Sequence, residues 1–248
     1  MVAICVSVGS AVPAAQEEIA ALERALGAAA PDMEWKRAFT SRRARQMLAR
    51  QGQPTLSLQE ALAGAAGQPV AVQPLLLLPG RAYEEIKSEV QAQRHCFPQI
   101  RLGKPLVSAQ EDLRALAAAL NRAYPAVAGE TLVLVGHGTD HEAGAAYVRL
   151  QAMFHAGGRG DIRVVTLKER LEKKALFSEL KAVAPAVHLV PLLLAAGKHV
   201  QTDIAGEGPE SWAGRLQGEG LSVRCTRRGL GTLPEIQNLF VQHFRSMR

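Results

Sequence analysis

Two apolar runs in the second half of the chain each end in a glycine-containing turn that carries a histidine. The first run, Val133–Val135, is followed by a Gly-His-Gly turn at His137, and the second, Val187–Leu194, by Ala-Ala-Gly-Lys and then His199. Short apolar runs that end at glycine are typical of strands buried on both faces of a parallel sheet. Because open α/β sheets bind ligands beyond the carboxyl ends of their strands, we expect both imidazoles to face one cleft.

Strands and helices alternate along the chain, and their order restarts after a linker near residues 125–130. Each half predicts strand, helix, strand, helix, strand, and the segment Val70–Gly80 parallels Val187–Gly197. We interpret the pattern as an internal repeat, although convergent apolar strands could imitate one. We therefore expect an α/β protein of two similar domains, residues 1–126 and 127–248, each a mostly parallel sheet flanked by helices. A return of the last helix to the first domain is left open.

The hydrophobic periodicity gives bounds for these elements. The predicted strands are 2–8, 34–39, 70–78, 131–135, 162–167, 187–194 and 222–227. The predicted helices are 13–29, 41–50, 55–63, 82–93, 109–124, 142–155, 169–183, 210–219 and 234–247. Residues 102–106 are predicted as a turn or short strand. Ser57 and Glu60 are expected to form a capping box at the third helix.

The composition is that of a globular protein and excludes several classes. The chain has 248 residues, of which 48% are hydrophobic and 21% charged. Its three cysteines are widely spaced and form no CxxC motif, which indicates reduced thiols rather than a disulfide framework or a zinc site. No signal peptide is visible, and no apolar run reaches the roughly 18 residues of a membrane span. We therefore expect a cytoplasmic protein. The missing signal peptide also disfavours a periplasmic-type solute-binding module, unless such a peptide was trimmed.

The net charge of +6 favours an anionic partner. Nucleic acid is disfavoured because aromatic residues make up only 4% of the chain and no basic stripe with interleaved aromatics occurs. The densest basic stretch, Arg42–Arg50, is typical of a solvated helix face. A small polyanion fits the charge better than DNA does.

The chemistry of the chain centres on its histidines. Imidazole is both a metal ligand and a base that works near neutral pH, and the matching positions of His137 and His199 favour such a role over helix capping. For His141 a capping role and a place at the cleft rim stay open. His188 lies inside an apolar strand and is interpreted as a core histidine. Asp203 is either a partner of a metal site or a helix-start acid, and the same holds for Glu207.

Common catalytic motifs are missing from the chain. No glycine-rich dinucleotide fingerprint follows the first strand, and no P-loop, GxSxG or HExxH motif occurs. A distinct set of motifs instead runs in order over some two hundred residues. They are Arg37–Ser41, Val72–Leu75, Gly80 with Tyr83 and Glu84, Gly136–Thr139 with His141 and Ala145–Tyr147, Pro191–Leu194, Ala196–Gly197 with His199 and Asp203, Ser211–Trp212, Gly229–Gly231 and Ile236–His243.

With these motifs the chain resembles the anaerobic cobalt chelatases (sirohydrochlorin cobaltochelatases), class II chelatases of the ferrochelatase-like group. The resemblance implies an ATP-independent lyase of cobalamin or tetrapyrrole biosynthesis that inserts Co²⁺, or Fe²⁺ or Ni²⁺, into sirohydrochlorin. It implies no cofactor beyond the metal substrate, no nucleic-acid or membrane partner, and a possible homo-oligomer. The ring carries eight carboxylates, which suits the basic chain.

The resemblance also assigns residues. His137 and His199 match the family histidines that bind the metal and take protons from the pyrrole nitrogens, which makes them the expected catalytic and metal-binding residues. Contacts with the ring are expected from the loops that bear the motifs and from three cations. These residues are Ser10, Gly138, Thr139, His141, Lys198, Lys168 and Arg81.

The chain departs from the family where acids are expected. Arg81 and Ala82 replace an acidic pair, Lys168 aligns with a glutamate, and Lys198 replaces an aspartate; Glu169 is a possible substitute for the lost glutamate. Cations in place of carboxylates weaken the attraction of a divalent metal and strengthen that of a ring rich in carboxylates. Two hypotheses follow: a working chelatase with an altered set of acids, or a chelatase-like protein that binds a metallated ring as a carrier.

Overall fold

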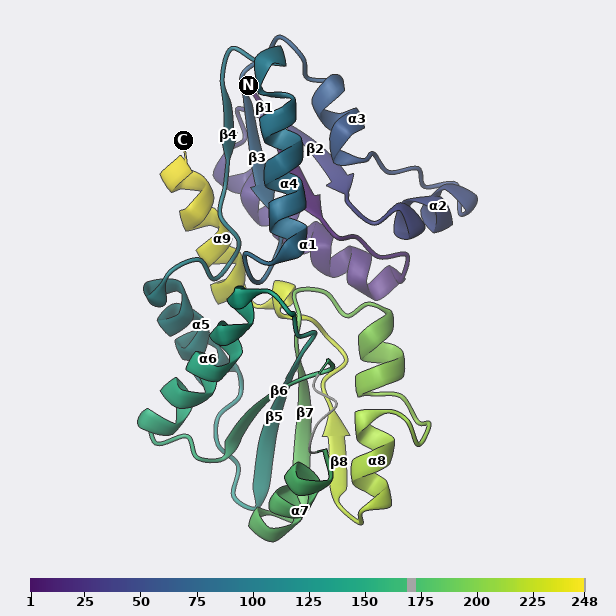
Figure 1. The fold of residues 1–248 in the computed structure, drawn as a ribbon, viewed down its shortest axis with the longest axis vertical. Helices are drawn as coiled ribbons and strands as arrows, with labels where there is room; N and C mark the ends of the chain where they lie inside the picture. Colours follow the sequence, from purple (N-terminus) through teal and green to yellow (C-terminus); the bar gives the residue numbers. More distant parts are fainter. Residues whose placement is uncertain (169–172, 248) are drawn as a thin grey trace.

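The computed structural model describes residues 1–168 and 173–247. Within them the chain forms two parallel sheets of four strands each, one above the other in Figure 1. The first sheet has the order β2-β1-β3-β4 and the second β6-β5-β7-β8. The two orders are the same, and the α/β class of two similar parallel sheets flanked by helices is confirmed.

The elements of the first half alternate as predicted. They are β1 (Val2–Ser7), α1 (Pro13–Ala29), β2 (Glu34–Phe39), α2 (Arg42–Arg50), α3 (Leu58–Ala63), β3 (Val70–Pro74), α4 (Arg81–Ala92), η1 (Arg94–Cys96), β4 (Ile100–Leu102) and α5 (Gln110–Ala123). The expected capping box opens α3, where the Ser57 side chain accepts from the Glu60 amide and the Glu60 carboxylate accepts from the Ser57 amide.

The second half repeats the order. Its elements are β5 (Glu130–Gly136), η2 (Glu142–Gly144), α6 (Ala145–Ala156), β6 (Ile162–Thr166), α7 (Lys173–Val183), β7 (Ala186–Leu192), η3 (Val200–Ile204), α8 (Trp212–Gly218), β8 (Ser222–Cys225), η4 (Leu230–Thr232) and α9 (Pro234–Met247). The two segments that resemble each other in sequence, Val70–Gly80 and Val187–Gly197, contain β3 and β7, and these strands hold the same position in their sheets.

Several of the predicted bounds differ from those observed. The strand expected over 70–78 ends at Pro74, because the main chain leaves the ladder after Leu75 donates to the carbonyl of Val6. Of residues 102–106, predicted as a turn or short strand, only Leu102 belongs to a strand, because β4 ends there and the amide of Gly103 donates to the carbonyl of Val72. The helix expected over 169–183 is observed as α7, and the first residues of that prediction lie outside the described residues. The helix expected from residue 210 begins at Trp212, because Ser211 caps its amide groups.

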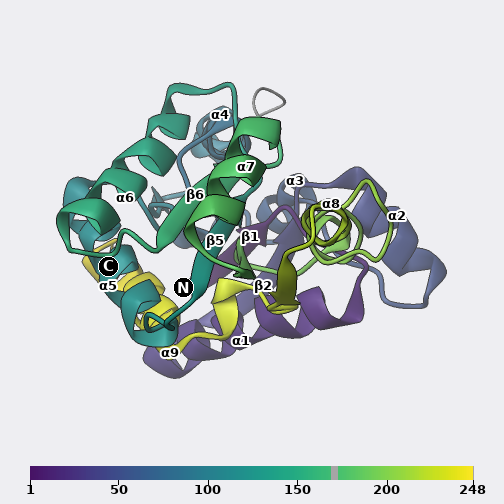
Figure 2. The same ribbon diagram turned by 90° about the horizontal axis from the view of Figure 1, so that it is seen from below.

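The last helix and the first sheet pack together. The ring of Phe244 in α9 lies 5.0 Å from that of Trp35 in β2, and Arg101 of β4 donates to the carbonyl of Met247. Figure 2 shows α9 beside α1. Ile236, Phe240 and Phe244 are fully buried in the same core cluster as Leu22 and Leu26.

The helix α5 belongs to the first half in sequence but packs on the second half. It ends the first half in sequence, yet it packs against α6 of the second half and against α9. Figure 1 shows it beside α6 at the lower sheet. One apolar core cluster consequently runs through both halves, from α1 and β1 to β5 and α6. The two halves are therefore joined by shared packing, not only by the linker.

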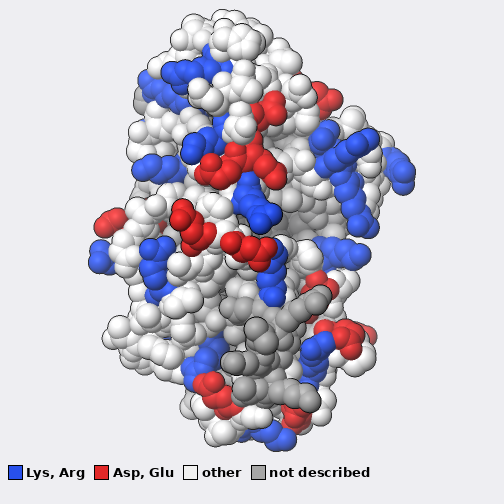
Figure 3. Space-filling model, viewed as in Figure 1, with Lys and Arg blue, Asp and Glu red and all other residues white. Residues whose placement is uncertain are grey.

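The surface agrees with the expected solvated basic face. Arg42, Arg43 and Arg50 of α2 are exposed, and Arg45 lies 3.8 Å from Glu60. Figure 3 shows Lys and Arg side chains gathered over α2, whereas the middle of the same face carries both signs of charge. Among the described residues, no helix has both the length and the apolar character needed to cross a membrane.

Candidate functional site

The carboxyl ends of β5 and β7 bring His137 and His199 together. The strands are parallel neighbours in which Gly136 pairs with Leu192, so the loops that follow leave the sheet at the same edge. The two imidazole rings lie with centroids 5.0 Å apart and planes at 73°. Both side chains are exposed at this edge. The sequence therefore predicted the proximity of the two rings, and their roles in catalysis stay predictions.

Each ring has one nitrogen engaged by an acceptor. The Nδ1 of His137 lies 3.1 Å from the carbonyl of Gly138, and the Nδ1 of His199 lies 2.5 Å from the carboxylate of Asp203. Carbonyl and carboxylate oxygens only accept, so both Nδ1 atoms carry the proton in these contacts. In the neutral imidazole the Nε2 lone pair is then left available for a metal or a proton.

Gly138 allows the loop of His137 to lie close to the end of β6. Its φ is +80°, and a Cβ atom there would lie 2.8 Å from the Oγ1 of Thr166 and 2.9 Å from the Cβ of Lys168. A side chain would meet both the strained φ and this contact. The glycine therefore fixes where the imidazole before it can lie.

The first half supplies the opposite wall of the site. A Cβ atom on Gly197, two residues before His199, would lie 3.3 Å from the Oγ of Ser10 in the loop after β1. A Cβ atom on Gly80, just before α4, would lie 3.7 Å from the Oγ1 of Thr139. Loops at the carboxyl ends of β1 and β3 thus face those of β5 and β7, and the predicted site residues gather between the two sheets.

Arg81, Lys168 and Lys198 are exposed, and each lies in or directly beside a loop of this site. The Nζ of Lys168 lies 3.0 Å from the carboxylate of Asp140. The largest cause of the lowered pKa of Asp140 is the hydrogen bond from Lys168, and the second is the positive charge of Lys168. The positive charge of Arg81 makes a smaller contribution to the lowered pKa of this carboxylate. Lys198 immediately precedes His199, and its carbonyl accepts from the hydroxyl of Thr202.

His141 and Thr139 stabilise their own loop. The amide of His141 donates to the Oγ1 of Thr139, and the Nδ1 of His141 accepts from the amide of Ala143 at the start of η2. The capping role that the sequence left open is therefore present. Contacts of these two residues with a ring stay predictions.

Asp203 is a partner of His199, whereas Glu207 is exposed. Partial burial raises the pKa of Asp203, but the hydrogen bonds from His199 and Thr202 outweigh it, so the pKa lies below its usual value. Among the described residues no group of three or more His, Cys, Asp and Glu side chains could hold a metal ion. Glu169, the suggested substitute acid, lies outside the described residues.

The ion pair of Lys168 and Asp140 was missed by sequence reasoning. The two residues lie in different loops, 28 positions apart, and no local pattern joins them. Glu18 was missed as well, although a signal exists. It falls in the buried stripe of α1 with Ile19 and Leu22, where a charged side chain is out of place unless it has partners.

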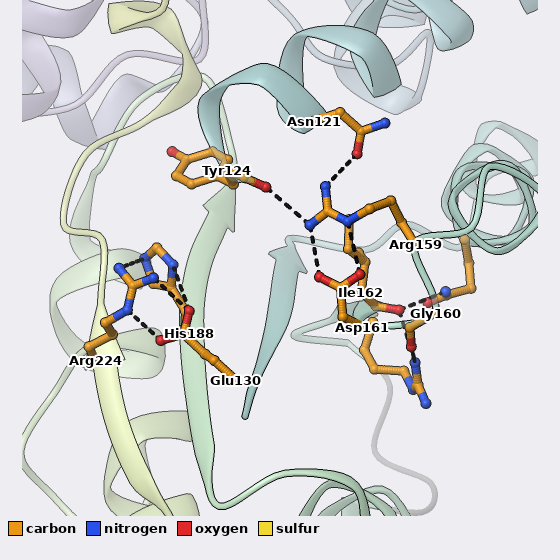
Figure 4. Close-up of polar contacts among 11 residues, drawn as sticks. Asn121, Tyr124, Glu130, Arg159, Gly160, Asp161, Ile162, His188 and Arg224 are labelled. Atoms are coloured by element: carbon orange, nitrogen blue, oxygen red, sulfur yellow. Dashed lines mark hydrogen bonds and ion pairs between the residues drawn. The ribbon is translucent and has the colours of Figure 1, made fainter. Parts of the chain in front are cut away.

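His188 lies away from this site, as expected for a core histidine. It is 5% exposed, and Figure 4 shows it beside the ion pair of Arg224 and Glu130 on the second sheet. Its Nε2 contacts the hydroxyl of Thr226 at 2.8 Å. Burial, together with the charge of Arg224, lowers the pKa of His188 to about 4. The side chain is thus neutral near pH 7 and belongs to a structural network.

Comparisons with known proteins agree with the resemblance seen in the sequence. The family model described as "Cobalt chelatase (CbiK)" matches residues 2–248. The sirohydrochlorin cobaltochelatase of Salmonella typhimurium is 36% identical over 234 residues, which cover 92% of this chain and 88% of the relative. The sirohydrochlorin cobaltochelatase CbiKC of Nitratidesulfovibrio vulgaris is 32% identical over 228 residues, which cover 86% of this chain and 78% of the relative.

A solved structure has the same fold. SirB from Bacillus subtilis, determined with Fe³⁺, superposes with a TM-score of 0.64 over 99% of this chain and 94% of its own, at 19% sequence identity. This likeness concerns the arrangement of strands and helices, and the sequence relatives decide the family. The chain belongs to the CbiK family of cobalt chelatases.

Proposed function

We propose that this protein is a sirohydrochlorin cobaltochelatase, an enzyme of cobalamin biosynthesis that inserts Co²⁺ into sirohydrochlorin. The observation that carries the proposal is the pair of imidazole rings 5.0 Å apart between the two sheets. The chain's membership of the CbiK family and its relatives named sirohydrochlorin cobaltochelatase support it. As the resemblance to class II chelatases implies, the proposed reaction uses no ATP and no resident cofactor, and the divalent metal is itself a substrate.

The geometry suits the proton balance of the reaction. As one Co²⁺ enters the ring, the two pyrrole N–H bonds break and two protons leave. His137 and His199 each have Nδ1 bound to an acceptor, so in the neutral imidazole the lone pair lies on Nε2. Such a nitrogen can bind the arriving metal or accept a proton at the ring centre. Asp203 accepts the Nδ1 proton of His199 and so holds the neutral ring in the tautomer whose Nε2 can accept a proton.

The cations at the site suit the substrate. Arg81, Lys168 and Lys198 are exposed near the loops of His137 and His199, and the proposed substrate carries eight carboxylates. Ion pairs with these cations would hold the ring near the imidazoles. Lys168 is already paired with Asp140, so a substrate carboxylate competes with that acid for the ammonium group.

An anaerobic absorbance assay tests the proposal. Purified protein is mixed with sirohydrochlorin with and without Co²⁺, beside a blank that contains metal and ring alone. We expect metallation faster than the blank. The variants His137→Ala and His199→Ala should lose about 10²-fold to 10⁴-fold of the rate, the usual range for loss of a general base.

The matched control is His155→Ala, an exposed histidine at the end of α6. Its rate should equal that of the unaltered protein. Turnover that is unchanged in both site variants would refute the assigned roles. A shifted ring spectrum without faster metallation would contradict the chelatase and support a carrier of a metallated ring.

A further inference from the structure

Glu18 is a carboxylate in an unusual place. It lies in α1, is 3% exposed, and is the one acidic residue that is buried among the residues the structure describes. Its neighbour Glu17 is exposed and pairs with Arg24 at the surface. A buried carboxylate is costly unless strong hydrogen bonds compensate it, so its partners reveal why it is there.

The partners of Glu18 are main-chain amides of the second half. The amide of Ala196 donates to one oxygen at 2.5 Å, and the amide of Gly229 donates to the other at 2.9 Å. The donors lie 178 and 211 positions further along the chain. Burial raises the pKa of Glu18, whereas the two amides and the nearby charge of Arg228 oppose this rise.

The first of these amides belongs to the loop that carries His199. Ala196 lies three residues before the histidine, and the turn between them is tight, since Val200 donates back to the carbonyl of Gly197. The same loop contacts the first half at Ser10, which lies in the segment that leads into α1. A movement at Ala196 is therefore transmitted to the imidazole.

The second amide, that of Gly229, belongs to a segment that packs against the main chain just before the His199 loop. A Cβ atom on Gly229 would lie 2.5 Å from the carbonyl oxygen of Leu194 and 2.7 Å from the main chain of Ala195. Leu230 and Gly231 also donate to the carbonyls of Leu193 and Leu194. Glu18 thus holds two backbone segments that already contact each other, and it joins both to α1.

We propose that Glu18 is a positioning residue: its carboxylate holds the loop of His199 at the distance from His137 and the first half that metal insertion requires. The inference rests on the proposed function. It adds a buried residue that is not among those expected to contact the ring. The charge is needed because a carboxylate accepts from both amides at once, with hydrogen bonds stronger than those of a neutral acceptor.

The variant Glu18→Gln tests this role at constant size. The glutamine oxygen can accept from one amide, but its NH₂ group then faces the other N–H, so the loop must move. We expect kcat of cobalt insertion to fall by about 10-fold to 100-fold, since misplacement of a catalytic group by about 1 Å costs on the order of 10²-fold. The KM for the ring should rise by no more than about 5-fold, the change expected for complete loss of Lys198, because that is the ring-binding cation on the displaced loop and Arg81 and Lys168 lie on other segments.

The matched control is Glu17→Gln, on the same helix, which should leave kcat and KM unchanged. NMR provides a readout that needs no turnover: in Glu18→Gln the ring resonances of His199 should shift and those of His155 should not. Equal kcat in both variants, or unaltered His199 resonances in Glu18→Gln, would overturn the proposal.

A measurement on the unaltered protein covers the case in which Glu18→Gln does not fold. The amide protons of Ala196 and Gly229 should exchange slowly with solvent and resonate downfield, as expected for donors to a buried carboxylate. Rapid exchange of both amides would overturn the proposal. Absence of cobalt insertion by the unaltered protein would instead refute the proposed function, and the amide and imidazole signals would still decide the role of Glu18.

Discussion

His199 donates the proton on its Nδ1 to the carboxylate of Asp203, which lies four residues further along the chain at 2.5 Å. His199 immediately precedes the π-helix η3, Val200–Ile204, and Asp203 lies in the first turn of that helix, so its carboxylate reaches the imidazole. Thr202 donates to the other oxygen of the same carboxylate. The arrangement sets both the ring's orientation and its tautomer.

Asp203→Asn should lower the rate of cobalt insertion by about 10-fold to 100-fold, the range found when an outer partner of a ligating histidine is removed. The amide keeps an acceptor but loses the negative charge that stabilises the imidazolium. Steady-state kinetics with sirohydrochlorin and Co²⁺ measure the effect. Glu207→Gln, an exposed acid nearby, is the control, and equal rates in the two variants would contradict the role of Asp203.

Lys198→Gln should raise the KM for sirohydrochlorin by about 2-fold to 5-fold and leave kcat unchanged, since an exposed ion pair contributes up to about 1 kcal/mol. The difference should shrink as salt is added, because ions screen exposed charges. Lys181→Gln, an exposed lysine on α7, provides the comparison. A KM that is the same for both variants at low salt would show that Lys198 does not meet the ring.

Gly138→Ala should destabilise the protein more than Gly158→Ala does. Both glycines have φ near +80°, but the space around Gly158 is open, whereas a Cβ at Gly138 meets Thr166 and Lys168. We expect the control to cost about 1 kcal/mol of the free energy of unfolding for its φ alone. The clash should add about 1–3 kcal/mol at Gly138. Urea unfolding of the two variants measures this, and equal midpoints would disprove the close approach of the His137 loop.

His188 should make the free energy of unfolding depend on pH. Its pKa is about 4 in the folded protein against an ordinary value of 6.5, so between these pH values the unfolded chain binds a proton that the folded chain does not. Stability from this group is therefore present above pH 6.5 and is lost as the pH falls to 4, by about 3 kcal/mol.

The variant His188→Gln isolates that contribution. Its free energy of unfolding should fall less steeply than that of the unaltered protein between pH 6.5 and 4. His95→Gln, which replaces an exposed histidine, should keep the original slope. Parallel curves for all three proteins would contradict the low pKa.

The strands and most helices follow from local sequence. The bounds of the strand Glu34–Phe39 and of the helix Pro234–Met247 are those the periodicity predicts. Strands buried on both faces leave continuous apolar runs, and the Gly-His-Gly turn marks where β5 ends. The neighbouring positions of β5 and β7 in one parallel sheet then bring His137 and His199 together.

Contacts between distant segments do not follow from local sequence. Glu17 and Glu18 are the same residue type in adjacent positions, and only the packing of η4 and the His199 loop against α1 makes one exposed and the other buried. The pairing of Lys168 with Asp140 depends in the same way on how two loops meet. The π-helix after His199 has no sequence signature that separates it from an ordinary turn.

The return of α9 to the first sheet constrains how the protein forms during synthesis. Trp35 and the apolar side of α1 are covered by a helix that is synthesised after every other helix and strand described above. N-terminal domains usually fold first as the chain emerges, but here the first half lacks part of its own core until α9 has emerged. The apolar surface that α9 covers is therefore exposed in the nascent first half until then.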